Sequence, residues 1–199
     1  ITFDGMPSLK RPVLSADTQK KLPDAVAIAS HDAPVPIEEL AKWTKKTAKA
    51  LDKKPDPSGF LVVRKDLFNV SVSQGTKDRA IQILNKLETA LSAAGMSFEV
   101  DDKEQHVVGK MLGESLSFSV TERYSRQEHV KKHPQYSWMD EKTYTYTFSG
   151  DLVVRIVGWF EGRKSWADGK TKRLEEKIAE VIEGFLAAAE AARTRRLEM

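Results

Sequence analysis

The spacing of hydrophobic residues changes several times along the chain, and each change predicts a different element. Apolar residues recur at helical spacing in 36–54 and 76–95, and again from about 169 to the end. Elsewhere they alternate with polar residues or form short runs bounded by turn residues, as in β-strands. The expected strands cover 60–64, 67–73, 97–100, 106–109, 115–123, 143–148 and 152–160.

The order of these elements predicts an α+β fold. We expect a two-layer domain, a mostly antiparallel sheet with two long helices on one face, preceded by an extended arm and one helix. Residues 1–35 are interpreted as a proline-containing arm or linker, because few periodic apolar positions accompany their prolines. Residues 36–59 are expected to form a helix and a connecting loop. Residues 60–199 are expected to form the α+β domain, which ends in a long C-terminal helix.

Two connections stand out in the second half of the chain. The segments "TYTYTF" and "LVVRIVGWF" flank Ser149-Gly150-Asp151, a sequence typical of a β-hairpin turn. A loop of about twenty residues is expected to begin at Arg123, and loops of that length in compact domains are usually functional or disordered. Tyr136 and Trp138 lie within it. The alternative is a solvated surface loop whose tryptophan packs into the core.

Composition excludes several kinds of chemistry. The chain has no cysteine, so it has no disulfide, no Cys–zinc site and no thiol nucleophile. The absence of cysteine fits a reducing cytoplasm, the location we expect. No apolar run approaches the ~20 residues that span a bilayer, and the first residues lack the apolar segment of a signal peptide. The net charge of +3 is only mildly basic.

Gly169-Lys170-Thr171 resembles the end of a phosphate-binding loop. That loop needs another glycine five residues before this one, where the chain has Lys164. The segment is better interpreted as a strand-to-helix junction. We expect Asp168 to accept hydrogen bonds from the first N–H groups of the helix, and Trp166 to pack beneath the turn.

Two clusters could bind a metal, and neither has the complete pattern. His129 and His133 have i, i+4 spacing, but no carboxylate follows His129 and lysines lie between them. Four acidic residues precede a lysine in a pattern that resembles a nuclease site: Glu99, Asp101, Asp102, Glu104 and Lys110. Its second strand lacks the expected acid, so a solvated turn is the favoured interpretation. We therefore predict no catalytic residue, metal or cofactor.

Basic residues give the main positive indication of function. They concentrate in 123–133 and 163–173, where few carboxylates oppose them. Cations near aromatic residues suit contact with phosphates and bases. The candidate nucleic-acid contacts are Arg123, Arg126, Lys131, Lys132, Arg163, Lys164, Lys170, Lys172 and Arg173.

The second half of the chain also resembles a group of uncharacterised bacterial proteins. The shared features, in order, are "DRAIQILNKLETALSAAG", "GESLSFSVTER", a basic loop, "YTFSGDLVVRI" and "WADGKTKRLEEKIAEVIEGFLAAAEAARTRR". The resemblance covers roughly residues 66–198. Members of that group typically begin with a helix-turn-helix segment and a Pro-rich linker, so the resemblance implies a DNA-associated, regulatory protein. No helix-turn-helix is visible in these residues.

Three functional hypotheses follow. The first is a non-enzymatic, DNA-associated bacterial protein in which this chain supplies dimerisation, a partner surface or auxiliary phosphate contacts. The second is a metal-dependent nuclease centred on the acidic cluster. The third is a protein–protein interaction module that assembles through its C-terminal helix. We expect a homo-oligomer with no membrane partner.

Overall fold

The computed structural model describes residues 14–30, 33–132, 141–158, 160 and 162–198. The helices within them are α1 (Ala16–Ala29), α2 (Lys42–Leu51), α3 (Lys77–Ala93) and α4 (Ile178–Glu198), with short 3₁₀ helices η1 (Ile37–Glu39) and η3 (Leu174–Lys177). The strands are β1 (Leu61–Val63), β2 (Asn69–Val72), β3 (Ser97–Val100), β4 (Val107–Met111), β5 (Glu114–Lys131), β6 (Glu141–Val157) and β7 (Ser165–Ala167). The predicted α+β class is confirmed.

The long strand β5 organises the sheet. It pairs with β4 near its start, with β2 around Val120, and with β6 over most of its length. β1 extends the sheet beyond β2, β3 beyond β4, and β7 beyond β6. The β2–β5 pairing is parallel and the other pairings of the described strands are antiparallel, so the predicted mostly antiparallel sheet is confirmed.

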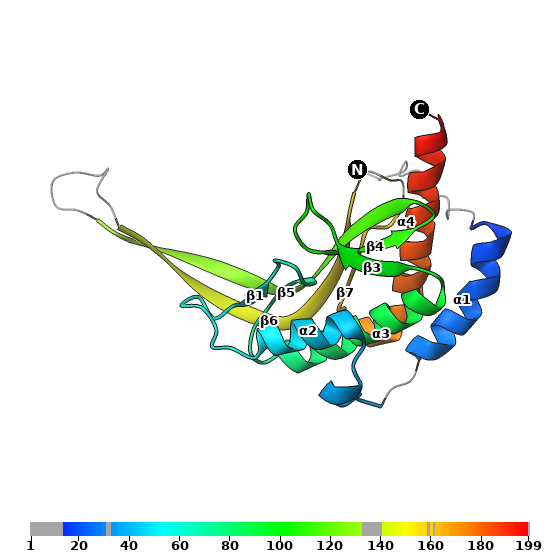
Figure 1. Ribbon diagram of the computed structural model, residues 1–199. Coiled ribbons are helices and arrows are strands. Elements are labelled where there is room, and N and C mark those ends of the chain that lie inside the picture. The colour runs from blue at the N-terminus through cyan, green and yellow to red at the C-terminus, as the bar shows by residue number, and fades with distance from the viewer. Residues whose placement is uncertain (1–13, 31–32, 133–140, 159, 161, 199) are drawn as a thin grey trace.

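One hydrophobic core joins the sheet to the helices, and Figure 1 shows how these elements are arranged. Phe118 of β5 is at its centre, with its ring centroid 5.2 Å from that of Phe68 and 5.1 Å from that of Phe185 on α4. The buried face of α3 supplies Leu84, Leu87 and Leu91. Burying these side chains contributes about 1.5–3 kcal/mol each.

The first expected element differs from the structure. Residues 16–29, interpreted as part of an extended arm, form helix α1 despite Pro23. Ser15 caps the helix, and its own N–H donates to Glu190 of α4 at 2.7 Å. Ala25 and Ala29 are completely buried. The contact face of α1 is built from small residues, which give a weak hydrophobic signal, and tertiary contacts with α3 and α4 stabilise it.

The helix expected over 36–54 is shorter, because α3 determines where α2 begins. Glu88 of α3 accepts from the N–H groups of Trp43 at 3.0 Å and Thr44 at 2.7 Å, and so satisfies the free donors of the first turn. α1 and α2 share the core of the sheet. The predicted boundaries at 35 and 59 set these helices apart from the main domain, whereas in the structure they belong to its core.

Both expected connections in the second half differ from the structure where it is described. Residues 123–131 continue β5 instead of beginning a loop, and Ser149-Gly150-Asp151 lies inside β6 instead of turning the chain. The rest of the expected loop, with Tyr136 and Trp138, lies outside the described residues. Gly150 has φ +79°, next to a register shift between Glu122 and Tyr124, so the glycine serves a β-bulge. Residues 123–131 show no regular alternation of apolar and polar side chains, because this part of β5 is exposed and does not face the core.

Gly184 of α4 allows the helix to approach Trp166 closely. A Cβ atom at this position would lie 2.1 Å from Cζ2 of the Trp166 ring, which is 1% exposed. Exchanging glycine for alanine within a helix ordinarily stabilises it by about 0.5–1 kcal/mol. We predict the opposite sign for Gly184→Ala, a loss of about 1–3 kcal/mol, because the buried ring must shift.

Urea unfolding of Gly184→Ala measures this loss directly, with Glu183→Ala as the neighbouring control on the exposed side of α4. The control should change the free energy of unfolding by less than about 0.5 kcal/mol. A Gly184→Ala protein as stable as the wild type would show that α4 and Trp166 are not in this contact.

Candidate nucleic-acid interface

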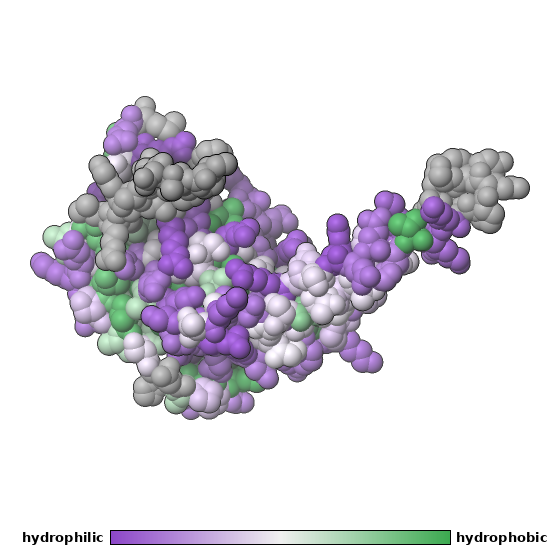
Figure 2. Space-filling view, turned by 180° about the vertical axis from the view of Figure 1, so that it is seen from behind, coloured by the Kyte–Doolittle hydropathy of each residue, from purple (hydrophilic) through white to green (hydrophobic). Residues whose placement is uncertain are grey.

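The outer parts of β5 and β6 form a two-stranded ribbon that projects from the body of the protein (Figure 1). Tyr124 pairs with Phe148 at its base, and Lys131 pairs with Glu141 at the last described pair. Almost all of its side chains are exposed. Figure 2 shows the ribbon as mainly hydrophilic, with paler residues toward the body. We call residues 124–131 and 141–148 the ribbon.

Alternation along the two strands gives the ribbon two chemically different faces, because residues opposite one another in an antiparallel pair share a face. The aromatic face consists of Tyr124, Arg126, Glu128, Val130, Lys142, Tyr144, Tyr146 and Phe148. The hydroxyl face consists of Ser125, Gln127, His129, Lys131, Glu141, Thr143, Thr145 and Thr147.

Phe60 anchors the aromatic face to the body. This residue precedes β1, and its ring centroid lies 5.0 Å from that of Tyr124, 5.3 Å from Tyr146 and 4.7 Å from Phe148. The three contacts are edge-to-face, the arrangement that aromatic quadrupoles favour. Phe60 therefore fixes the direction in which the ribbon leaves the sheet.

Charged side chains further along the aromatic face interact with one another. The guanidinium of Arg126 lies 4.7 Å from the centroid of the Tyr144 ring. Lys142 Nζ lies 2.8 Å from a Glu128 carboxylate oxygen, and this hydrogen bond lowers the pKa of Glu128. By contrast, Arg123, Lys131 and Lys132 have exposed side chains with no ion-pair partner among the described residues.

The second predicted basic group is divided between two places. Arg163 pairs with Glu180 at 2.7 Å, and Lys164 donates to the Gly158 carbonyl at 3.0 Å. Both lie beside the inner end of β6, away from the ribbon. Arg173 lies nearer the ribbon base, 3.4 Å from Asp151. Lys170 and Lys172 are exposed on the same turn. The structure thus places Arg126 and Lys131 on the ribbon, with Arg123 and Lys132 directly next to it in sequence, and leaves Arg163 and Lys164 apart from them.

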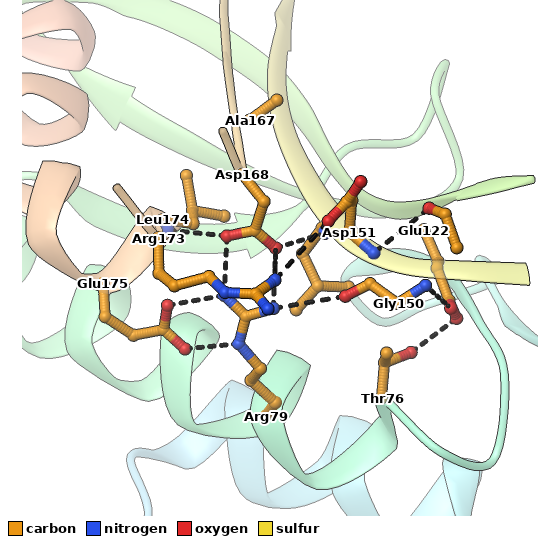
Figure 3. A network of polar contacts seen from close by, with 12 residues as sticks. Thr76, Arg79, Glu122, Gly150, Asp151, Ala167, Asp168, Arg173, Leu174 and Glu175 are labelled. Carbon is orange, nitrogen blue, oxygen red and sulfur yellow. Dashed lines mark hydrogen bonds and ion pairs between the residues drawn. The ribbon is translucent and has the colours of Figure 1, made fainter. Parts of the chain in front are cut away.

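A network of ion pairs centred on Arg79 lies below the ribbon base (Figure 3). Arg79 donates twice to Glu175, at 2.6 Å each, and twice to Asp168, at 2.6 and 2.7 Å. It also reaches the Gly150 carbonyl at 3.3 Å. All five N–H donors of the guanidinium therefore have acceptors. The network joins α3 to the bulge in β6, the end of β7 and the start of η3.

Asp168 holds this network together. Its side chain is 0% exposed, and it also accepts from the N–H groups of Leu152 and Leu174 at 2.7 Å each. Burial alone would raise the pKa of Asp168, but the hydrogen bonds from Arg79 and these N–H groups outweigh it and lower the pKa. The predicted capping role of Asp168 and the burial of Trp166 are confirmed.

Glu122 accepts a similar set of hydrogen bonds on the other side of the bulge. It accepts from the Thr76 hydroxyl at 2.6 Å and from the N–H groups of Ser73 and Gly150 at 2.7 and 2.9 Å. Burial would raise the pKa of Glu122, but these hydrogen bonds lower it below its ordinary value. The point at which the ribbon leaves the sheet is therefore tied to the start of α3.

The predicted acidic cluster has a structural use. Glu99 forms an ion pair with Lys110, and Asp101 accepts from the N–H groups of Lys103 at 2.9 Å and Glu104 at 3.1 Å within a turn. No group of three or more metal-ligating side chains occurs among the residues that the structure describes. His129 bonds to Thr145, whereas its proposed companion His133 lies outside the described residues.

His106 and Ser117 form a buried pair that the sequence pattern did not indicate. The pair lies by a groove on the side of the sheet opposite the core. His106 Nδ1 is 2.8 Å from the Glu104 carbonyl, which can only accept, so Nδ1 carries a proton. In the neutral ring Nε2 then accepts from the Ser117 hydroxyl at 2.7 Å. Each side chain satisfies the other, which explains their burial.

Sequence reasoning also missed Arg79, Glu122 and Phe60. Arg79 and Glu122 read as ordinary charged residues on a helix and a strand, and only the fold brings their partners together. Phe60 was interpreted as the start of a strand, although its position after Gly59 in "PDPSGF" was a signal that it follows a turn.

Comparisons with protein-family models, with curated proteins and with solved structures found no match for this chain. The resemblance to bacterial proteins that begin with a helix-turn-helix therefore stays a prediction. In the described part of the chain, no helix combines the length and the apolar character needed to cross a bilayer.

Replacing Asp168 by asparagine should destabilise the protein by about 3 kcal/mol, because it removes one charge of a buried, hydrogen-bonded network. Urea unfolding measures the change. Asp151→Asn is the matched control, since this carboxylate is partly exposed and contacts Arg173 only at 3.4 Å. Equal effects of the two substitutions would contradict the proposed importance of the network.

Acid should weaken the fold through the same carboxyls. Asp168, Glu122 and Glu175 all have lowered pKa values in the folded state. Below the ordinary carboxyl values of about 4, the unfolded chain therefore binds more protons than the folded one, and stability falls. The free energy of unfolding, measured by urea titration from pH 7 to 3, should decrease below about pH 4.5. The decrease should be smaller in Asp168→Asn. An identical decrease would show that protonation of Asp168 does not contribute to the loss of stability in acid.

Proposed function

We propose that this protein is a DNA-associated, regulatory protein and that the ribbon makes its principal contact with nucleic acid. The observation that supports this proposal is a projecting two-stranded ribbon accompanied by Arg123, Lys131 and Lys132, which have no ion-pair partner among the described residues. Such a ribbon is one of the elements that proteins insert into DNA grooves. Its exposed strands offer neither a core nor an enclosed pocket, so their use is best explained by contact with another molecule.

The distribution of charge supports the same surface. Residues 123–132 and 141–149 carry the cations Arg123, Arg126, Lys131, Lys132 and Lys142 against the carboxylates Glu128 and Glu141. The chain has a net charge of +3, and outside these two segments its cations and carboxylates balance. The excess positive charge therefore lies on the projecting strands, where a phosphate backbone would be attracted.

The remaining predicted contacts take secondary positions in this proposal. Lys170, Lys172 and Arg173 lie on the turn beside the ribbon base and would extend phosphate contact toward the body. Arg163 has an acidic partner in Glu180, so it would contribute less. Homo-oligomerisation is part of the proposal because dimeric readers present two such elements to adjacent half-sites; the mass of the protein in solution tests it.

The proposal predicts a specific salt dependence. Each phosphate contact removed should reduce the slope of log K against log salt by about 0.9 for duplex DNA. We therefore expect Lys131→Gln with Lys132→Gln to weaken DNA binding and to reduce the slope by roughly two. Fluorescence anisotropy at several salt concentrations measures both quantities.

An adjacent pair of exposed lysines on α1 provides the matched control. Lys20→Gln with Lys21→Gln removes the same charge from a helix on the side of the body away from the ribbon (Figure 1). It should leave the slope close to that of the wild type. If both double variants behaved alike, net charge and not the ribbon would explain binding.

A further inference from the structure

We propose that the hydroxyl face of the ribbon is its reading surface, and that its ligand is B-form double-stranded DNA entered through the major groove. This inference rests on the proposed function, because it assumes that the ribbon contacts nucleic acid. It adds which face makes the contact, which form of nucleic acid is bound and which groove is used.

The hydroxyl face retains its hydrogen-bonding capacity. Within the described part of the chain, the side chains of Ser125, Gln127, Thr143 and Thr147 have no hydrogen-bond partner. One side-chain bond is present on this face, between His129 Nε2 and Thr145 Oγ1 at 3.0 Å. The free side chains of Ser125 and Thr147 stand opposite one another, and the free amide of Gln127 stands opposite Thr145, the residue that bonds to His129.

The aromatic face, by contrast, is occupied by its own contacts. Phe60 packs edge-to-face against Tyr124, Tyr146 and Phe148. The guanidinium of Arg126 covers the Tyr144 ring at 4.7 Å. Proteins that bind single strands stack bases on open aromatic rings. Tyr124 and Tyr144 are 51% and 40% exposed, but these contacts already cover part of each ring. The geometry therefore favours a duplex over a single-stranded ligand.

The chemistry of the hydroxyl face matches the edges of bases in a duplex. Glutamine can donate to and accept from adenine, and serine and threonine hydroxyls can bond to several bases. The major groove of B-DNA, about 12 Å wide, admits a two-stranded ribbon. The major groove of A-form RNA is too narrow for side chains to read, so an RNA duplex is disfavoured.

Phosphate-directed cations border this face along the ribbon. Arg123 precedes it at the base, Lys131 is its last residue on β5, and Lys132 follows at the outer end. All three are exposed and have no ion-pair partner in the described residues. Contacts with the DNA phosphates position the protein element on the duplex, and contacts with the edges of the bases provide sequence specificity. The order of the residues along the strand therefore fits one groove crossing between two phosphate contacts.

The test uses the whole chain and a library of duplexes of random sequence. After selection, affinities are measured for the preferred duplex, a scrambled duplex, the corresponding single strand and the same sequence as an RNA duplex. We expect the preferred DNA duplex to bind best. We also expect the bound protein to protect guanine N7, in the major groove, from methylation, and to leave adenine N3, in the minor groove, accessible.

Substitutions then distinguish the two faces. Gln127→Ala, and Thr143→Val with Thr147→Val, remove polar groups from exposed positions while keeping a strand-compatible residue at the threonines. Each should weaken the preferred duplex by about tenfold or more, and change binding to the scrambled duplex little. Val130→Ala, which shortens an exposed side chain on the aromatic face, is the control and should bind like the wild type.

The results that would contradict the proposed function differ from those that would contradict this inference alone. A wild-type protein that binds no nucleic acid would overturn the proposed function and this inference together. Binding that survives all hydroxyl-face substitutions, protects adenine N3, or prefers single strands or an RNA duplex would overturn this inference alone. Loss of binding on changing Tyr144 to leucine, with Gln127→Ala unaffected, would assign the contact to the aromatic face instead.

Discussion

A single half-buried guanidinium determines how the parts of this protein meet. Arg79 projects from the first turns of α3 and gives all five of its donors to Asp168, Glu175 and the Gly150 carbonyl. The side chain of Asp168 is 0% exposed. A buried charge of this kind is tolerated only when it is paired and hydrogen-bonded, so these groups must assemble together. The pKa of Arg79 is raised by these hydrogen bonds, those of Glu175 first, so the charge is permanent.

This network explains how the ribbon is supported. Two-stranded ribbons are only marginally stable alone in water. Here the strands continue from the core of the sheet, where Phe118 and Val120 of β5 are buried, and a bulge redirects them at Gly150. Arg79 binds the carbonyl of Gly150 and Glu122 binds its N–H, so the bulge is held from both sides. Phe60 completes the support on the aromatic face.

The sequence pattern predicted the fold class and the core helices because burial on one face leaves a periodic apolar signal. The prediction failed where an element buries few large apolar side chains and depends on contacts with distant parts of the chain. Helix α1 buries small residues and relies on Glu190, and the ribbon buries almost nothing. The site was predictable in part: the cations at 123–132 were identified, whereas their strand geometry was not. The partners of Arg79 lie 71 to 96 residues away in sequence, so no local pattern could reveal them.

The most direct test of the central claim is to record backbone amide chemical shifts of the whole protein while duplex DNA is added. If the ribbon is the contact, shifts should concentrate in residues 124–131 and 141–148, with smaller changes at the turn containing Lys170 and Lys172. The amides of α1 and of the outer face of α4 should stay unchanged. Shifts centred on those helices, or no shifts at DNA concentrations that saturate the protein, would contradict the account.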